Sequence, residues 1–178
     1  MTFKDAKQGF VLFKASRTSW SFVASSFGGL ASMILAQRRP DRVHSIVLLA
    51  PAFDPVRIWK SNMNIDQWKR NGYLNHYNSV SKREEPVNYE FFDDLKKHPA
   101  YPIVKSCPIT IVHGRDDFIV PIESSREYCR KLVEPSRFPT RLIEVDDDHH
   151  LAKAKTLEII ETAISETFLL EKKRVTFL

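Results

Sequence analysis

Four short apolar segments most constrain the fold that this chain can adopt. They are WSFVA (20–24), HSIVLLA (44–50), PITIVHG (108–114) and RLIEV (141–145). Apolar runs of this length, bounded by charged residues or proline, are typical of strands that are buried on both faces of a sheet. Helical patterns follow three of them, over 28–37, from Pro121 to about 133, and over 151–170. This alternation predicts an α/β fold, a three-layer α/β/α structure with a mostly parallel sheet.

The N-terminal residues predict one more helix, over residues 2 to about 15. Thr2 is a candidate N-terminal cap, and Phe10 and Phe13 lie on an apolar stripe with helical spacing. No strand is therefore expected before residue 20.

The segment 53–105 is far longer than one crossover between parallel strands requires. It mixes many charges with large apolar side chains, namely Trp59, Met63, Trp68, Tyr73, Tyr77, Phe91 and Phe92. We interpret it as a helical cap excursion within a single domain, residues 1–178. The cap either lines an apolar pocket or only contributes packing.

Composition limits the classes of partner. The 178 residues are 43% apolar and carry a net charge of +5, with the basic residues scattered. Basic and aromatic residues interleave in RIWKSNM (57–63) and QWKRNGY (67–73), but no nucleic-acid-binding motif accompanies them, so we expect no nucleic-acid partner.

No apolar run is long enough for a membrane span, and the N-terminus lacks a secretory signal. Cys107 and Cys129 have no metal-ligand spacing, so free thiols and a cytoplasmic location are expected.

Small residues surround a serine where the first predicted strand turns into its helix, in ASSFGG (24–29). A nucleophilic serine on such a turn needs small residues two before and two after it. Ser26 has Ala24 and Gly28 there, whereas Ser25 would have a valine and a phenylalanine. Ser26 is therefore the better candidate nucleophile, although a turn of small residues can also serve packing alone.

An acid and a base are available after the next predicted strands. HGRDDFIVP (113–121) offers Asp117, with Asp116 as the competing carboxylate. DDDHHL (146–151) offers two adjacent histidines. The carboxyl ends of parallel strands meet at one edge of the sheet, where α/β folds place their sites. A histidine there can take the proton of the serine while the acid orients its other nitrogen.

Two alternatives concern the same segments. The cluster Asp146, Asp147, Asp148, His149 and His150 could bind a metal, but adjacent ligands on one short loop rarely complete a metal shell. His113, at the end of its strand, is more often structural than catalytic.

The order Ser, Asp, His, each after a predicted parallel strand, resembles the α/β-hydrolase superfamily. The resemblance rests on ASSFGG, HGRDDFIVP and DDDHHL, and it extends from residue 2 to about 170. Small serine esterases and acyl thioesterases are the most similar members. The four strands match the last four of the eight in that fold, so the chain resembles its C-terminal part, without the N-terminal strands.

The resemblance implies roles for individual residues. Ser26 would be the nucleophile, Asp117 the acid and His149 the base, with His150 as the alternative base. The backbone N–H of Phe27 would be one oxyanion donor. The implied reaction is cleavage of carboxylic esters or thioesters of small acyl substrates through an acyl-enzyme intermediate, and it needs no metal or organic cofactor.

The resemblance also implies what is missing. The second oxyanion donor of the superfamily comes from a loop after its third strand, which we do not expect within these 178 residues. The strand 20–24 would have an unpaired apolar edge, covered by the first helix, by a second copy in a homodimer or by another polypeptide. The alternative function is therefore a truncated hydrolase-like binding protein with weak or no activity. A start codon assigned too far downstream would produce the same sequence.

Overall fold

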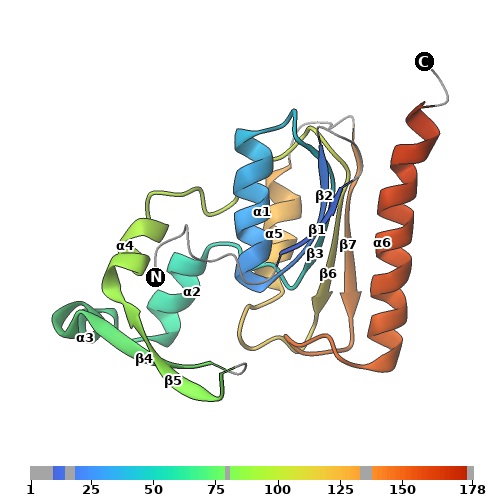
Figure 1. The fold of residues 1–178 in the computed structure, drawn as a ribbon. Coiled ribbons are helices and arrows are strands. Elements are labelled where there is room, and N and C mark those ends of the chain that lie inside the picture. The colour runs from blue at the N-terminus through green and yellow to red at the C-terminus, as the bar shows by residue number, and fades with distance from the viewer. Residues whose placement is uncertain (1–9, 15–18, 79–80, 133–137, 176–178) are drawn as a thin grey trace. The chain divides into compact units, whose positions relative to one another are not determined.

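The computed structural model describes residues 10–14, 19–78, 81–132 and 138–175 (Figure 1). These residues fall into two compact units. One comprises residues 54–100, and the other comprises the remaining described residues, which contain the candidate site.

The larger unit contains a five-stranded sheet. Its strands, in spatial order, are β1 (Phe10–Lys14), β2 (Trp20–Ser25), β3 (Val43–Leu49), β6 (Ile109–Gly114) and β7 (Thr140–Val145). The last four are parallel to one another, whereas β1 is antiparallel to β2. The four strands predicted from the apolar runs are thus confirmed, within one residue at each end.

Helices cover both faces of this sheet (Figure 1). They are α1 (Ser26–Arg38), α5 (Glu123–Lys131) and α6 (Ala154–Val175). Helix α1 packs on β2 and β3, whereas α6 packs on β3 and β6 from the opposite face. The predicted three-layer α/β/α arrangement with a mostly parallel sheet is confirmed.

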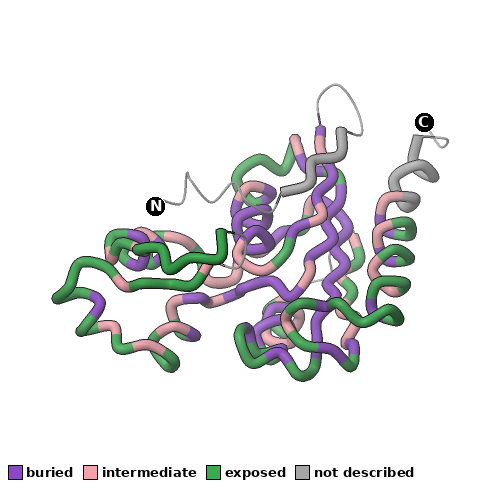
Figure 2. Tube along the Cα trace, turned by 60° about the horizontal axis from the view of Figure 1, so that its bottom comes forward, coloured by how far each residue is buried: buried purple, intermediate pink, exposed green. Residues whose placement is uncertain are grey.

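The central strands form the core. Every residue of β6 is buried, and in β3 the residues from Ser45 to Leu48 are buried as well (Figure 2). Burial on both faces explains why these segments have continuous apolar runs rather than alternating patterns. Toward α6, Val112 and Val145 of the sheet pack with Leu151 and Ala163.

The N-terminal helix is wrong over residues 10–14. These residues form β1, which pairs with β2 from Phe10 opposite Ala24 to Lys14 opposite Trp20. An apolar run such as FVLF suits a strand as well as a helix, and the edge of β2 supplies backbone partners for an extended chain. The rest of the predicted helix lies outside the described residues. The unpaired edge predicted at β2 is therefore also wrong, because β1 is hydrogen-bonded to it.

The smaller unit contains three short helices and a hairpin. They are α2 (Pro55–Asn62), α3 (Ile65–Asn71), β4 (Tyr73–Asn78), β5 (Arg83–Asn88) and α4 (Tyr89–Leu95). Its core is aromatic: Trp68 lies 5.7 Å from Trp59 and 5.6 Å from Phe92 between ring centroids. The Trp68 indole N–H donates to the carbonyl of Val87 at 2.9 Å, which joins α3 to the hairpin.

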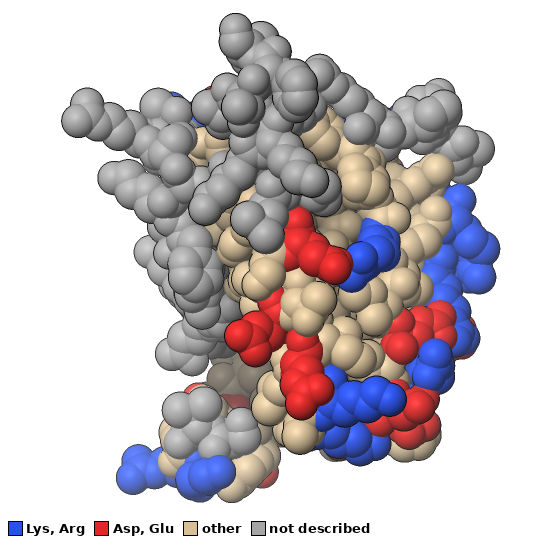
Figure 3. Space-filling view, turned by 90° about the vertical axis from the view of Figure 1, so that its right-hand side faces the viewer, with Lys and Arg blue, Asp and Glu red and all other residues tan. Residues whose placement is uncertain are grey.

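The face that includes α6 shows acidic and basic side chains interspersed (Figure 3). An ion pair of 2.8 Å joins Arg141 of β7 to Glu166 of α6. No helix among the described residues is both long enough and apolar enough to cross a membrane.

Candidate active site

Ser26 occupies a strained turn between β2 and α1. Its φ is +49°, in the left-handed region that residues other than glycine seldom adopt. Its carbonyl accepts a hydrogen bond from the N–H of Ala52 at 2.9 Å, which holds the turn against the segment after β3. Ser25, one residue earlier, has ordinary extended backbone. The structure therefore places Ser26 at the turn, as the small-residue pattern predicts.

A close approach of two segments explains the second glycine of the motif. A Cβ atom on Gly29 would lie 2.9 Å from the Cβ of Pro51, too close for a normal contact. Gly28 and Ala24 are both buried. The side chains of the motif are small because the start of α1 lies directly against the segment that follows β3.

Asp117 lies on the loop after β6, and its side chain is buried, with 5% of the residue exposed. Its Oδ1 accepts hydrogen bonds from the N–H groups of Ile119 at 2.9 Å and Val120 at 2.8 Å. These bonds fix the carboxylate within its own loop. The competing Asp116 is exposed, and its backbone N–H donates to the carbonyl of Asp147.

The loops after β6 and β7 are joined through their backbones. The N–H of Arg115 donates to the carbonyl of Val145 at 2.8 Å, and the N–H of Asp116 donates to that of Asp147 at 3.1 Å. A Cβ on Gly114 would collide with the carbonyl oxygen of Asp147. Glycine at the end of β6 is thus what lets the acid loop lie against the histidine loop.

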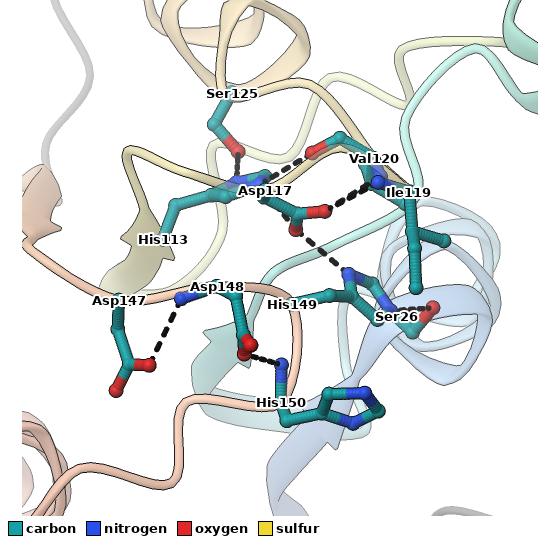
Figure 4. Close-up of polar contacts among 10 residues, drawn as sticks. All are labelled: Ser26, His113, Asp117, Ile119, Val120, Ser125, Asp147, Asp148, His149 and His150. Carbon is teal, nitrogen blue, oxygen red and sulfur yellow. Dashed lines mark hydrogen bonds and ion pairs between the residues drawn. The ribbon is translucent and has the colours of Figure 1, made fainter.

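His149 connects the acid to the serine (Figure 4). Its Nδ1 lies 2.7 Å from Oδ2 of Asp117, and its Nε2 lies 3.1 Å from Oγ of Ser26. A carboxylate only accepts, so we assign the proton to Nδ1, which leaves Nε2 to accept the hydroxyl proton of Ser26. The structure brings together the three predicted residues Ser26, Asp117 and His149.

His150 takes no part in this series. It is exposed, and its backbone N–H donates to Oδ1 of Asp148 at 2.8 Å. Figure 4 shows its ring pointing away from Asp117. The structure therefore favours His149 over His150 as the histidine of the site.

Competing effects set the charge of Asp117. Burial alone would raise its pKa, but hydrogen bonds from His113, His149 and the N–H of Val120 outweigh this, and the pKa lies well below its usual range. Asp117 is therefore ionised at neutral pH. An ionised carboxylate only accepts hydrogen bonds, so it holds the proton on Nδ1 of His149.

The remaining acidic residues after β7 have structural partners. The carboxylate of Asp147 accepts from the N–H groups of Asp148 at 2.9 Å and Lys153 at 3.0 Å, and Asp146 pairs with Arg115. Within the described ranges, no three His, Cys, Asp or Glu side chains are grouped so as to hold a metal. The structure thus gives these carboxylates the role of shaping the loop that carries His149.

A second buried histidine contacts the acid. Nε2 of His113 lies 3.2 Å from Oδ2 of Asp117 and 2.9 Å from the carbonyl oxygen of Val120, and Nδ1 lies 2.8 Å from Oγ of Ser125. The sequence assigns His113 no role at the site. Its position at the buried end of an apolar strand could have indicated such contacts, because a buried polar ring needs hydrogen-bond partners.

Apolar side chains follow the acid directly. Phe118 is 89% exposed and Ile119 is 56% exposed. In Figure 4 the side chain of Ile119 points from the acid loop toward Ser26. Large apolar side chains that are exposed beside the polar groups of a site are typical of a surface that binds an apolar ligand.

The sequence profile of the prolyl oligopeptidase family (Peptidase_S9) matches residues 22–175, which include all three residues of the site. The chain belongs to the prolyl oligopeptidase family.

Individual relatives of this prolyl oligopeptidase family member are mammalian proteins. Over 150 residues it is 23% identical to the palmitoyl-protein thioesterase ABHD10, mitochondrial, of Rattus norvegicus, covering 81% of this chain and 50% of that protein. The protein of the same name from Homo sapiens is 24% identical, with 81% and 48% covered. The chain thus spans about half the length of the curated relatives it matches.

Solved structures show the same fold. The alpha/beta hydrolase domain-containing protein 10 from mouse superposes with a TM-score of 0.68 at 21% identity, covering 89% of this chain and 64% of that one. Est1E from Butyrivibrio proteoclasticus gives a TM-score of 0.64 at 22% identity, with 85% and 60% covered. Together with the family match over residues 22–175, this shared fold makes the chain an α/β-hydrolase superfamily member that represents part of the fold.

Proposed function

We propose that this chain carries the site of a serine hydrolase that cleaves carboxylic ester or thioester bonds. The observation that supports this most is the hydrogen-bonded series from Ser26 through His149 to Asp117, built on a serine with a φ of +49°. A strained backbone that aims a hydroxyl at an imidazole is the arrangement of an activated nucleophile.

The reaction would proceed in two halves. Oγ of Ser26 attacks the acyl carbon while Nε2 of His149 takes the hydroxyl proton, and that proton then passes to the leaving alcohol or thiol. Water attacks the resulting acyl-serine, His149 takes its proton, and the carboxylic acid leaves as the proton returns to Ser26. Asp117 stays ionised throughout and stabilises the imidazolium. The route uses no metal or organic cofactor.

The negative oxygen of each tetrahedral intermediate needs hydrogen-bond donors. We assign the backbone N–H of Phe27 as one, because it follows Ser26 in the first turn of α1, where the helix dipole favours negative charge. No second donor is assigned among the described residues. Loss of one donor lowers the rate by about 100- to 1000-fold, so we expect slow turnover if Phe27 acts alone.

The substrate class follows from the surroundings of the site. The exposed side chains of Phe118 and Ile119 beside Asp117 favour an apolar acyl group. Relatives are named palmitoyl-protein thioesterases, which supports an acyl thioester as a substrate. The cytoplasmic location and the homodimer stay predictions.

Labelling with a fluorophosphonate probe tests the proposal. The wild-type chain, shown to be folded by circular dichroism, should be modified at Ser26, and Ser26→Ala should abolish the modification. Ser25→Ala is the matched control, because Ser25 is adjacent and exposed and its side chain makes no cap hydrogen bond to α1. A folded chain that stays unlabelled would favour the alternative, a hydrolase-like binding protein.

A further inference from the structure

The acid of the site is held by four hydrogen bonds. Two come from backbone N–H groups of its own loop, one from His149, and one from the side chain of a residue outside the series of three. Oδ1 of Asp117 accepts from the N–H groups of Ile119 and Val120. Oδ2 faces the rings of both His149 and His113 (Figure 4). An ionised carboxylate offers about four acceptor positions, so those of Asp117 are all used. The carboxylate therefore cannot rotate without breaking a bond.

The partners of His113 determine where its proton lies. Nε2 faces only acceptors, Oδ2 of Asp117 and the carbonyl of Val120, so Nε2 must carry a hydrogen. Nδ1 faces the hydroxyl of Ser125, which is able to donate. His113 and Ser125 are both 0% exposed, so these contacts are the polar surroundings of the ring. The neutral ring with its proton on Nε2 satisfies every one of these contacts.

Neutrality matters because the two rings share one oxygen. A charged His113 would attract the same carboxylate that must stabilise the charge on His149 during the reaction. A neutral donor holds Oδ2 in place and leaves the negative charge of Asp117 for His149.

We propose that His113 and Ser125 are positioning residues of this site. Ser125 donates to Nδ1 of His113 and thereby fixes the neutral ring with its proton on Nε2, and this N–H orients Oδ2 of Asp117 toward His149. The role in catalysis rests on the proposed function, but the arrangement of protons does not.

Nitrogen-15 NMR of the histidine rings in the full chain tests the proton positions without any substrate. At neutral pH, His113 should show a protonated Nε2 and an unprotonated Nδ1. His149 should show a protonated Nδ1 that exchanges slowly with water. The His149 signal should persist in His113→Gln, because a glutamine side chain can place an N–H near the position of Nε2, and it should be lost in His113→Leu.

The rate of fluorophosphonate labelling at Ser26 tests the consequence. We expect His113→Leu to slow labelling by roughly 100-fold, the cost of a misplaced catalytic group, and His113→Gln to recover most of that loss. Ser125→Ala should slow labelling more than Ser45→Ala does. Ser45 is the matched control, because it is also fully buried and donates one side-chain hydrogen bond, to Oγ of Ser21 at 2.7 Å, away from the site.

The outcomes separate the two proposals. A wild-type chain that is folded but unlabelled contradicts the proposed function, and the NMR signals of His149 then decide the positioning role by themselves. A doubly protonated His113, or a His149 signal that is unchanged in folded His113→Leu, overturns the positioning role whatever the labelling shows. If His113→Leu does not fold, loss of the His149 signal in His113→Gln overturns it. Equal labelling rates for Ser125→Ala and Ser45→Ala would mean that Ser125 has no positioning role.

Discussion

Asp117 and His149 are 32 positions apart in the sequence, yet Oδ2 of the acid lies 2.7 Å from Nδ1 of the histidine. Adjacent parallel strands cause this proximity. Each residue lies on the loop that follows its strand, Asp117 after β6 and His149 after β7, and these strands are paired along their whole length. The carboxyl ends of both strands therefore lie at the same edge of the sheet. Ser26, which directly follows β2, lies at this edge as well.

The first prediction removes the charge of the acid. Asp117→Asn should slow labelling of Ser26 by roughly 10⁴-fold, because an amide can stabilise the wrong tautomer of His149 and gives its imidazolium no counter-charge. Labelling rates on folded protein measure the effect. Asp116→Asn is the control, since Asp116 is adjacent and exposed, and it should label at the wild-type rate. Equal rates for both variants would remove Asp117 from the site.

The second prediction concerns the contact between the two loops. Gly114→Ala should lower the free energy of unfolding by about 1–3 kcal/mol, because the added Cβ collides with the backbone carbonyl of Asp147. Urea denaturation measures this change.

Gly72→Ala provides the comparison. Gly72 has a φ of +76° but no atom within 4 Å of an added Cβ, so it reports backbone strain alone, about 1–2 kcal/mol. We expect only Gly114→Ala to slow labelling of Ser26 as well, because it pushes apart the loops of Asp117 and His149. Normal labelling in Gly114→Ala would show that the close approach serves stability only.

The sequence predicts the parallel core and the site for the same reason. Strands β3 and β6 are buried on both faces, which leaves an apolar run that is visible without a structure. The site residues follow such strands directly, so the topology of the fold brings them together.

Other elements depend on information that a local pattern does not contain. Strand β1 is extended because β2 offers an edge, whereas its own residues suit either a helix or a strand. The hairpin of β4 and β5 is mostly exposed and contains Pro86, so neither alternation nor composition indicates strands there. The contact of His113 with Ser125 depends on where α5 begins relative to the end of β6.

The third prediction uses the lowered pKa of Asp117. A folded-state pKa below the unfolded value means that ionised Asp117 stabilises the fold above the unfolded pKa of about 3.9, and that this contribution is lost as the pH falls toward the folded value. Wild type should therefore be more stable than Asp117→Asn at pH 7, and the difference should shrink below about pH 4. Urea unfolding of both proteins from pH 7 to pH 2 measures it. A difference that does not change with pH would mean that folding does not lower the pKa of Asp117.

The last prediction concerns the apolar side chains beside the acid. If Phe118 and Ile119 contact the acyl group, replacing both with serine should raise KM for long-chain p-nitrophenyl esters by about tenfold and leave KM for the acetate ester nearly unchanged. The reason is that each methylene withdrawn from water contributes about 0.8 kcal/mol, and only a long chain has methylenes to bury there.

Leu157→Ser is the matched control, since Leu157 is also a large exposed apolar residue, 53% exposed, but lies on α6. It should leave the dependence of KM on chain length unchanged. If the double variant raises KM equally for acetate and long-chain esters, the acid loop affects the site as a whole and does not select the acyl chain. If neither value changes, the acyl group lies elsewhere, and the exposure of Phe118 and Ile119 then needs another explanation, such as contact with a protein that carries the acyl group.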